Sequence, residues 1–278
     1  MRIALFENPD SGSGEAGDVE RALRRHGAEV TSFPLDEVDA ALATDPDRIV
    51  VAGGDGSVGC AAEGAARAGA ALAVVPVGTA NDFARAMGLP DGLEEATRLA
   101  ATGARLRRMD LARMGRRPFV NVASLGLAPV AARKASGLKR ALGPGAYALG
   151  ALRAGLTAEP VRCELLCDGE RAFAGEAWQA TVACSGAFGG GAELDADPHD
   201  GLLDAVVIRA RSRASLARHA YGLRSGTIGE QPGVHSCRAA TIELRVAPGT
   251  AFNVDGEVVE SGPVRFEVEA AAFDLVVG

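Results

Sequence analysis

The sequence predicts two domains of different fold class, an N-terminal α/β domain and a C-terminal antiparallel β-sandwich. Over residues 1–110, short apolar runs alternate with helical patterns, which is typical of a parallel sheet covered by helices on both faces. Over residues 111–278, short β-branched segments separated by Gly, Asp or Pro dominate, as in antiparallel sandwiches. The chain has 278 residues, of which 47% are hydrophobic, and this is enough for a sizeable core.

The N-terminal domain is expected to alternate strands and helices from its first residues. The segments expected as strands are residues 2–6, 29–33, 49–52 and 71–76. The segments expected as helices are residues 15–26, 38–43, 58–68, 80–87 and 93–101. Ligands of parallel α/β sheets bind outside the carboxyl ends of the strands, so the loops that follow the strands are the expected site.

The C-terminal domain is expected to consist mainly of strands. Its predicted strands are residues 118–122, 161–167, 178–184, 203–208, 241–246, 264–268 and 273–277. Helical patterns interrupt them at residues 129–153 and 212–224. We therefore expect a sandwich with two helical insertions.

The charge of the chain argues against nucleic-acid binding. The formal net charge is −7 at pH 7, whereas nucleic-acid binders carry a basic footprint. Of the 29 basic residues, only Lys134 and Lys139 are lysines. The N-terminal domain therefore has neither a GxxxxGKS/T phosphate loop nor the strand lysine of a protein kinase.

The cysteine, histidine and apolar patterns are those of a soluble, cytoplasmic protein. The five cysteines form no CxxC pair and are odd in number, so we expect small buried thiols in a reducing compartment. The four histidines show no zinc-ligand spacing. The N-terminal apolar run is too short for a signal peptide, and no run reaches about 18 uncharged apolar residues.

Two glycine-rich loops compete for a phosphate-binding role, and the first spans residues 12–17. It matches GxGxxG, and Asp36 follows about twenty residues later, as in a dinucleotide-binding fingerprint. Residues 8–11, however, separate the preceding strand from the first glycine, so the tight strand-to-helix turn is missing. A nicotinamide site is therefore the weaker interpretation of this loop.

The second loop is Gly53-Gly54-Asp55-Gly56-Ser57, directly after an apolar strand. Glycine lets backbone N–H groups approach an anion closely, and the helix that follows directs its positive end at the same point. Bare phosphate would repel Asp55, but a carboxylate suits Mg²⁺ bound to nucleotide phosphates. The loop therefore indicates a nucleotide phosphate site with a metal, or else an ordinary turn with a capping Asp.

A similar loop follows the next strand. Gly78, Thr79, Asn81 and Asp82 lie there, before another predicted helix. Polar, glycine-bearing loops at the ends of successive strands predict a binding crevice rather than an isolated turn.

The motifs of this chain resemble those of one family along nearly its whole length. "GGDGS" (53–57) and "PVGTANDFAR" (76–85) resemble the catalytic domain shared by diacylglycerol kinases, sphingosine kinases and bacterial lipid kinases. Further motifs follow in the family's order, namely "NPDSGSG" (8–14), "NVASLG" (121–126), "LKRALGPGAYALGALR" (138–153), "GGGAELDADPHDGLLD" (189–204) and "NVDGE" (253–257). The motif at residues 8–14 explains the GxGxxG match without a nicotinamide site.

The resemblance implies an α/β nucleotide-binding domain of the NAD kinase and diacylglycerol kinase type, a β-sandwich, and an active site between them. It implies that Asp55, with the flanking Gly53, Gly54, Gly56 and Ser57, holds ATP phosphates and Mg²⁺. The loop after the next strand, with Gly78, Thr79 and Asn81, would contact the nucleotide.

In the β-sandwich, the resemblance implies a metal loop and a base. Asp200 would bind a structural metal, together with backbone carbonyls near Asp197 and Leu202. Glu257 would take the proton of the acceptor hydroxyl. From the residues alone, Asp255-Gly256-Glu257 reads as a hairpin turn and the loop at Asp200 as an Asp-Gly turn, whose oxygens also suit Mg²⁺ or Ca²⁺.

Four positions depart from the family pattern, and one of them is a Thr usual at the end of the second strand, which has no clear counterpart in "SFPLDEVDA" (32–40). Ser57 stands where the family commonly has Thr, and Gly59 and Cys60 stand where it often has Asn and Glu. The expected function is an ATP- and Mg²⁺-dependent lipid kinase of phospholipid metabolism, with a lipid hydroxyl such as that of diacylglycerol as acceptor. The alternatives are a kinase of a soluble or sphingoid acceptor, including an NAD kinase, and a catalytically silent lipid- or nucleotide-binding protein.

One dense basic stretch is relevant to the question of membrane binding. Arg133, Lys134, Lys139 and Arg140 lie in the first helical insertion, either as a patch that attracts anionic lipid or as a solvated helix face. The expected partners are ATP, a lipid acceptor and, transiently, a membrane surface, with no nucleic acid. The sequence identifies neither the lipid nor the oligomeric state.

Overall fold

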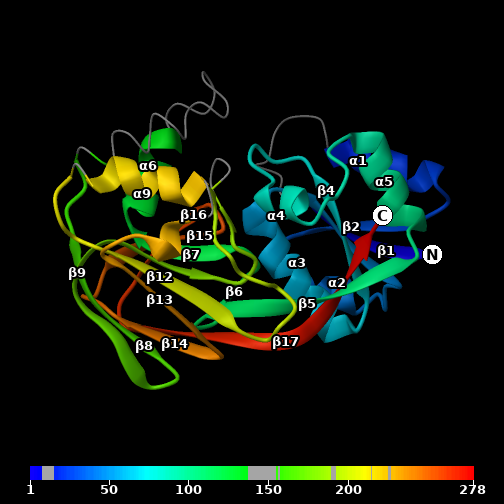
Figure 1. The fold of residues 1–278 in the computed structure, drawn as a ribbon. Coiled ribbons are helices and arrows are strands. Elements are labelled where there is room, and N and C mark those ends of the chain that lie inside the picture. The colour runs from blue at the N-terminus through cyan, green and yellow to red at the C-terminus, as the bar shows by residue number, and fades with distance from the viewer. Residues whose placement is uncertain (8–15, 137–154, 156, 189–191, 214, 225–226) are drawn as a thin grey trace. The chain divides into compact units, whose positions relative to one another are not determined.

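The computed structural model describes residues 1–7, 16–136, 155, 157–188, 192–213, 215–224 and 227–278 (Figure 1). Their contacts divide the chain into two compact units. The first comprises Met1–Leu111 with Glu269–Gly278, and the second comprises Ala112–Val268. The sequence predicted a domain boundary at residue 110, with 269–278 in the second domain. The structure instead groups 269–278 with the first unit.

The first unit is built on a parallel sheet with the strand order β2-β1-β3-β4-β17. Its strands are β1 (Arg2–Glu7), β2 (Glu29–Pro34), β3 (Arg48–Gly53), β4 (Ala71–Pro76) and the end of β17 (Val264–Val277). The first four confirm the predicted strands to within one residue at each end.

Helices cover both faces of this sheet (Figure 1). They are α1 (Ala16–Arg25), α2 (Val38–Leu42), α3 (Asp55–Ala68), α4 (Asp82–Ala86) and α5 (Leu93–Thr102). Buried side chains of α1 and α5 share one apolar cluster with the sheet, including Leu23 and Ala100. On α3, Gly64 packs near Ile49 and Phe6 of the strands. The predicted α/β class is therefore confirmed.

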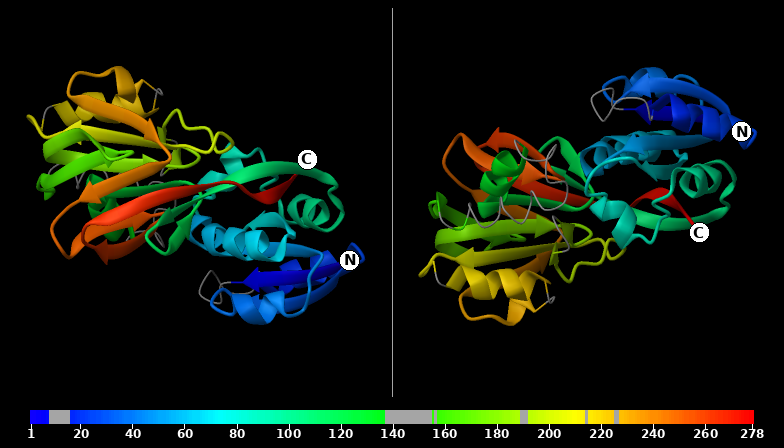
Figure 2. Two further views of the ribbon diagram at one scale, coloured as in Figure 1. Left: turned by 90° about the horizontal axis from the view of Figure 1, so that it is seen from below. Right: turned by 90° about the horizontal axis from the view of Figure 1, so that it is seen from above.

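Strand β17 begins in the second unit and ends in the first, and Figure 2 shows it as one continuous red strand. It replaces the two separate strands expected at 264–268 and 273–277. Between them, Ala271 has a left-handed backbone (φ 51°), and its N–H donates to Asp110 Oδ1 at 2.7 Å. Leu275 then pairs in parallel with Leu72, which makes the chain end a strand of the first unit.

The second unit is a β-sandwich. Its described strands pair with one another in antiparallel fashion. Its strands, besides the start of β17, are β5 (Arg105–Met114, which begins in the first unit), β6 (Arg117–Phe119), β7 (Val122–Gly126), β8 (Val161–Cys167), β9 (Glu170–Ala183), β12 (Leu203–Arg209), β13 (Val234–Ala239), β14 (Thr241–Arg245), β15 (Thr250–Val254) and β16 (Glu257–Ser261). The first half of β9 pairs with β8, and the second half pairs with β7 and β12.

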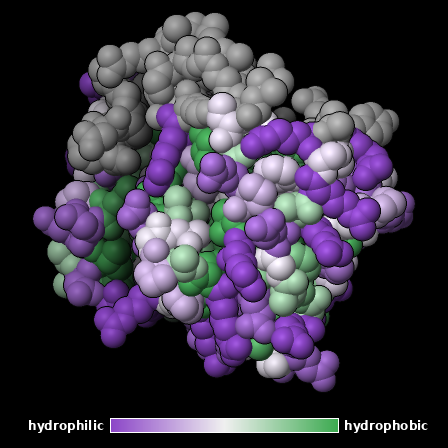
Figure 3. Space-filling view, turned by 90° about the vertical axis from the view of Figure 1, so that its left-hand side faces the viewer, coloured by the Kyte–Doolittle hydropathy of each residue, from purple (hydrophilic) through white to green (hydrophobic). Residues whose placement is uncertain are grey.

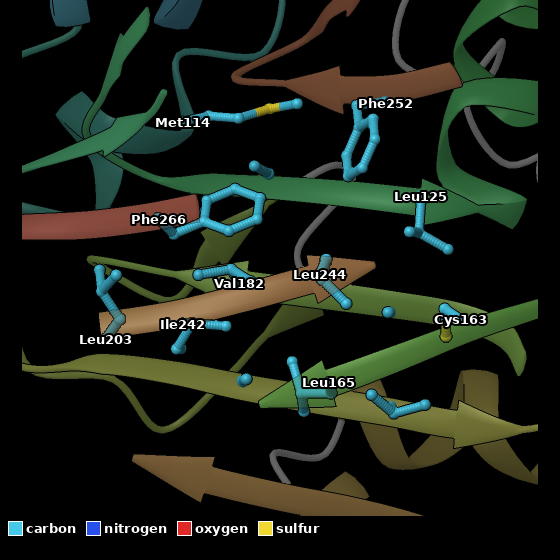
Figure 4. Close-up of a cluster of buried hydrophobic side chains, with 14 of the residues drawn as sticks. Met114, Leu125, Cys163, Leu165, Val182, Leu203, Ile242, Leu244, Phe252 and Phe266 are labelled. Atoms are coloured by element: carbon cyan, nitrogen blue, oxygen red, sulfur yellow. The ribbon is translucent and has the colours of Figure 1, made fainter. Parts of the chain in front are cut away.

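The core of the second unit lies between these strands (Figure 4). Phe119, Phe252 and Phe266 are fully buried in it. The rings of Phe119 and Phe266 meet edge to face, with centroids 6.2 Å apart. Burial of a Phe side chain contributes roughly 1.5–3 kcal/mol, so these three anchor the strands that carry them.

Short elements complete the second unit. They are α6 (Leu127–Ser136), α9 (Ser215–Arg224), a 3₁₀ turn at Ile228–Glu230, and the small hairpin of β10 (Ala187–Phe188) and β11 (Ala192–Glu193). The predicted helical insertions begin at α6 and α9, but Lys139, Arg140 and the rest of 137–154 lie outside the described residues. The GxGxxG segment at 12–17 lies largely outside them as well.

One prediction about the cysteines is wrong. Cys167 of β8 and Cys237 of β13 form a disulfide, with Cα atoms 6.7 Å apart. Cys163 and Cys184 are buried thiols, as expected, and Cys60 is a half-buried thiol; none of these three takes part in the disulfide. The two linked residues are 70 positions apart in sequence, so only the pairing of the strands brings them together.

None of the helices in the described part of the chain has the length and apolarity needed to span a bilayer. Figure 3 shows one face of the protein, on which hydrophobic patches alternate with hydrophilic side chains.

Candidate active site

The glycine loop of residues 53–57 joins β3 to α3. Gly53 is buried, and a Cβ atom there would lie 2.8 Å from the Ser57 hydroxyl oxygen. Gly54 is the N-cap residue of α3, and its carbonyl accepts the N–H of Ser57 at 3.0 Å. The positive end of the α3 dipole therefore lies at this loop, next to backbone with no side chain in the way.

The loop of residues 77–81 joins β4 to α4, and the Asn81 side chain holds it together. The Asn81 side chain accepts the N–H of Gly78 and donates to the carbonyl of Gly78, both at 3.0 Å. Its own backbone is left-handed (φ 51°), a conformation that Asn adopts more readily than most residues. Asn81 therefore fixes this loop, while Thr79 lies exposed on it.

The two loops meet, as their position after neighbouring strands predicted. A Cβ atom on Gly78 would lie 2.5 Å from the Cα of Gly54, so the backbones are in direct contact. Asp55, the first residue of α3, accepts the N–H of Asp82 at 3.1 Å and that of Phe83 at 2.8 Å. Its carboxylate thus ties the start of α4 to the start of α3, a role that sequence reasoning did not assign to it.

The turn between β15 and β16 is fixed by a buried carboxylate. Asp255 is 7% exposed and accepts the N–H groups of Val120, Asn121 and Val122 at 2.8–3.1 Å. In return, its N–H donates to the Val122 carbonyl at 3.0 Å. Sequence reasoning found the turn but not this function of Asp255, because its partners lie more than 130 positions away.

Glu257, the predicted base, follows this turn and begins β16. Its side chain is 53% exposed and forms an ion pair with Arg117 of β6. No sequence pattern distinguishes Arg117, which is one of many arginines in this chain.

The predicted metal loop carries carboxylates with protein partners. Asp200 accepts the N–H of Leu202 at 2.9 Å and forms an ion pair with Arg238 of β13. Asp197 accepts the N–H of His199 at 3.1 Å. Within the described residues, no three His, Cys, Asp or Glu side chains are grouped closely enough to hold a metal. A metal in this loop would need backbone carbonyl ligands.

Asp204, next to this loop, was not predicted. Burial, and then the charges of Asp195 and Asp197, raise the pKa of the Asp204 carboxyl to about 6. Its Oδ1 faces Arg238 Nε at 3.3 Å, and its Oδ2 is buried without a partner among the described residues. A buried carboxylate oxygen is one of the ligand types that hard cations such as Mg²⁺ and Ca²⁺ accept.

Comparison with known proteins identifies the family. Residues 2–114 match the diacylglycerol kinase catalytic domain, and residues 121–277 match the YegS C-terminal NAD kinase beta sandwich-like domain. The chain belongs to the diacylglycerol kinase-like family of lipid kinases. The sequence-based resemblance is thus confirmed, and the chain is of the phosphotransferase class.

Relatives within the family match the chain over most of its length. A Pseudomonas putida protein named "Probable lipid kinase YegS-like" is 31% identical, over 99% of this chain and 89% of its own. A Staphylococcus saprophyticus diacylglycerol kinase is 29% identical, over 95% of this chain and 92% of its own. A crystal structure of a diacylglycerol kinase from Bacillus anthracis strain Sterne shares the fold, with a TM-score of 0.79, 22% identity, and coverage of 100% and 97% of the two chains.

Proposed function

We propose that this protein is an ATP- and Mg²⁺-dependent lipid kinase that transfers the γ-phosphoryl group of ATP to a lipid hydroxyl such as that of diacylglycerol. The observation that carries the proposal is the meeting of the two glycine loops beside the start of α3. A side chain at Gly78 would clash with the backbone of Gly54, and backbone N–H groups at a helix N-terminus suit phosphate.

In this proposal the two loops bind different parts of ATP. Gly53, Gly54, Gly56 and Ser57 hold the ATP phosphates through backbone and hydroxyl groups. Gly78, Thr79 and Asn81 contact the rest of the nucleotide, with Asn81 acting through the shape of its loop. No lysine lies in this half of the chain, so the positive field comes from backbone dipoles, arginine and the metal.

Asp55 and Glu257 carry the chemistry in this proposal. Asp55 holds Mg²⁺, which neutralises charge on the phosphates when it is bound. Glu257 accepts the proton of the acceptor hydroxyl, and general-base help of this kind contributes roughly 10²–10⁴ in rate. Asp200 binds a second, structural metal together with backbone carbonyls near Asp197 and Leu202, and the buried oxygen of Asp204 supports a cation there.

The acceptor decides between this proposal and its alternatives. The lipid-kinase names of the relatives support a lipid acceptor. A soluble or sphingoid-type acceptor, including NAD, is the alternative for an active enzyme. A silent binding protein is the alternative suggested by Gly59 and Cys60, which replace the family's usual Asn and Glu.

A panel of acceptors with labelled ATP tests the proposal directly. We expect phosphorylation of diacylglycerol or another lipid in mixed micelles with Mg²⁺, and none of NAD. Phosphorylated NAD would support the soluble-acceptor alternative, and ATP binding without transfer to any acceptor would support the silent one.

Glu257→Gln separates the base role from binding. We expect parental ATP affinity by calorimetry and a kcat that falls about 10²–10⁴-fold with saturating acceptor. A kcat near the parental value would reject Glu257 as the base. Loss of ATP affinity would instead assign Glu257 to the metal or the nucleotide.

We also propose that the protein works in the cytoplasm and contacts the membrane surface transiently. Arg133 on α6 is exposed and lies 3.6 Å from Glu260, and an exposed arginine suits anionic headgroups. Sedimentation with vesicles of phosphatidylglycerol, compared with phosphatidylcholine alone, tests this, and equal recovery with both would reject it.

A further inference from the structure

Arg117 and Glu257 are 140 positions apart in sequence, yet they form an ion pair within the second unit. Arg117 contributes its Nη2 atom, and Glu257 contributes Oε2. Oε1 of Glu257 has no hydrogen-bond partner among the described residues. The pair therefore fixes one carboxylate oxygen and leaves the other to accept a proton.

Both ends of the pair are held by rigid structure. Arg117 pairs with Met114 in the hairpin of β5 and β6, two residues before the fully buried Phe119. Glu257 lies two residues after Asp255, whose carboxylate binds the N–H groups of residues 120–122. The Asp255 clamp thus joins the segment after Arg117 to the turn before Glu257, and the two side chains meet as a result.

The pair is too exposed to contribute much to stability. The side chains of Arg117 and Glu257 are 37% and 53% exposed, and exposed ion pairs contribute little to folding. Its consequence is geometric, because a Glu side chain samples several rotamers unless a partner selects one. A proton acceptor must lie within hydrogen-bond reach of the hydroxyl, and a small misplacement lowers the rate.

We propose that Arg117 is a positioning residue that holds the Glu257 carboxylate in the orientation from which Oε1 accepts the proton of the acceptor hydroxyl. This inference rests on the proposed function. In that step the O–H bond breaks and its proton passes to Glu257. The acceptor oxygen bonds to the γ-phosphorus, the bond from that phosphorus to the β–γ bridging oxygen breaks, and ADP leaves.

A double-mutant cycle with Arg117→Ala and Glu257→Gln tests this role. We expect Arg117→Ala to lower kcat by about 10- to 100-fold, with KM for ATP and for the acceptor unchanged. Arg117→Lys, which keeps the charge but not the planar fork, should retain an intermediate kcat. In the Glu257→Gln background, Arg117→Ala should have no further effect on kcat.

Arg265→Ala is the matched control. Arg265 forms an ion pair with Glu267 in the same unit, with side chains 57% and 55% exposed. We expect parental kcat for this variant, and melting temperatures near the parental value for Arg117→Ala and Arg117→Lys.

Three results would overturn the proposal. A parental kcat for Arg117→Ala, with Glu257→Gln inactive, would show that the base needs no such partner. A further loss in the Glu257→Gln background, or a higher KM for either substrate, would mean that Arg117 contacts substrate itself. Full activity of Glu257→Gln alone would reject the base assignment, a failure of the proposed function that is visible without any Arg117 variant.

Discussion

At the scale of single residues, two carboxylates organise this protein by accepting backbone N–H groups. Asp55 accepts two at the start of α4, and Asp255 accepts three in the segment 120–122. Hydrogen bonds to charged groups are about twice as strong as neutral ones, so a single carboxylate can fix a whole turn. Asp55 therefore has a structural role in addition to the proposed metal-binding one.

Asp55→Asn separates these roles only in part, and we expect it to affect both. An Asn side chain has one acceptor oxygen, so it cannot accept the N–H groups of both Asp82 and Phe83 in the same geometry. We expect a loss of roughly 1–3 kcal/mol in the free energy of unfolding, together with weaker Mg²⁺–ATP binding and no transfer.

Chemical denaturation and calorimetry measure the two effects, with the exposed Asp36→Asn as control. Parental stability would contradict the hydrogen-bonding role of Asp55. Parental ATP turnover would reject this loop as the phosphate site.

At the scale of elements, the candidate nucleotide site depends on two loops that touch through glycine. Gly54 belongs to the turn before α3, and Gly78 to the turn after β4. Neither turn alone requires a missing side chain at these positions. The requirement comes from the contact between the turns, in which a Cβ on Gly78 would lie 2.5 Å from the Cα of Gly54.

Gly78→Ala should therefore force the two loops apart. Because the clash is with backbone rather than a flexible side chain, we expect a loss of roughly 1–3 kcal/mol in stability and weaker ATP binding. Gly92→Ala is the matched control, since nothing lies within 4 Å of a Cβ at that position. Equal melting temperatures and ATP affinities for the two variants would contradict the contact.

The proposed structural metal at the loop around Asp200 can be tested by the effect of Mg²⁺ on the melting temperature. In the parent protein, added Mg²⁺ should raise the melting temperature, because a bound ion stabilises the folded state. Asp200→Ala should abolish this dependence and also lower the melting temperature without Mg²⁺, since it loses Arg238 and the N–H of Leu202.

Arg238→Ala is the informative partner variant in this loop. It removes the ion pair but keeps the Asp200 carboxylate, so the response to Mg²⁺ should remain. A response that is lost in Arg238→Ala but kept in Asp200→Ala would rule out the proposed ligand.

At the scale of the whole molecule, long-range covalent and strand connections hold each unit together. The last strand of the first unit is supplied by the chain end, where Phe273, Leu275 and Val276 are buried. In the second unit, the Cys167–Cys237 disulfide closes a loop of 70 positions. Both connections join residues that are distant in sequence.

Reduction of this disulfide should destabilise the second unit. A link that closes a loop of about 70 residues contributes roughly 4 kcal/mol, chiefly by limiting the unfolded chain. We expect three free thiols in denaturant without reductant and five after reduction, with a melting temperature lower by about 10 °C in the reduced protein.

Native labelling is a poor substitute for this count, because burial raises the pKa of the Cys163 thiol to about 11. Cys167→Ser should reproduce the destabilisation, and Cys60→Ser should not. Five reactive thiols in the unreduced, denatured protein would contradict the disulfide.

Local sequence patterns were enough to predict the fold class and the loops of the candidate site. Alternation of apolar runs with helical patterns is a local property, and it placed β1 to β4 to within a residue. The glycine loops followed from their position after successive strands, and the family followed from motifs such as residues 76–85 and 253–257. Each of these signals lies within a short stretch of chain.

The partners of the key side chains, in contrast, follow from tertiary contacts. Three contacts join segments that no local pattern connects. They are Asp55 with the N–H groups of α4, Asp255 with residues 120–122, and Arg117 with Glu257. The same holds for the chain end, which completes the first unit. The physical reason is that hydrogen bonds and ion pairs act over a few ångströms in space, whereas sequence patterns record only neighbours along the chain.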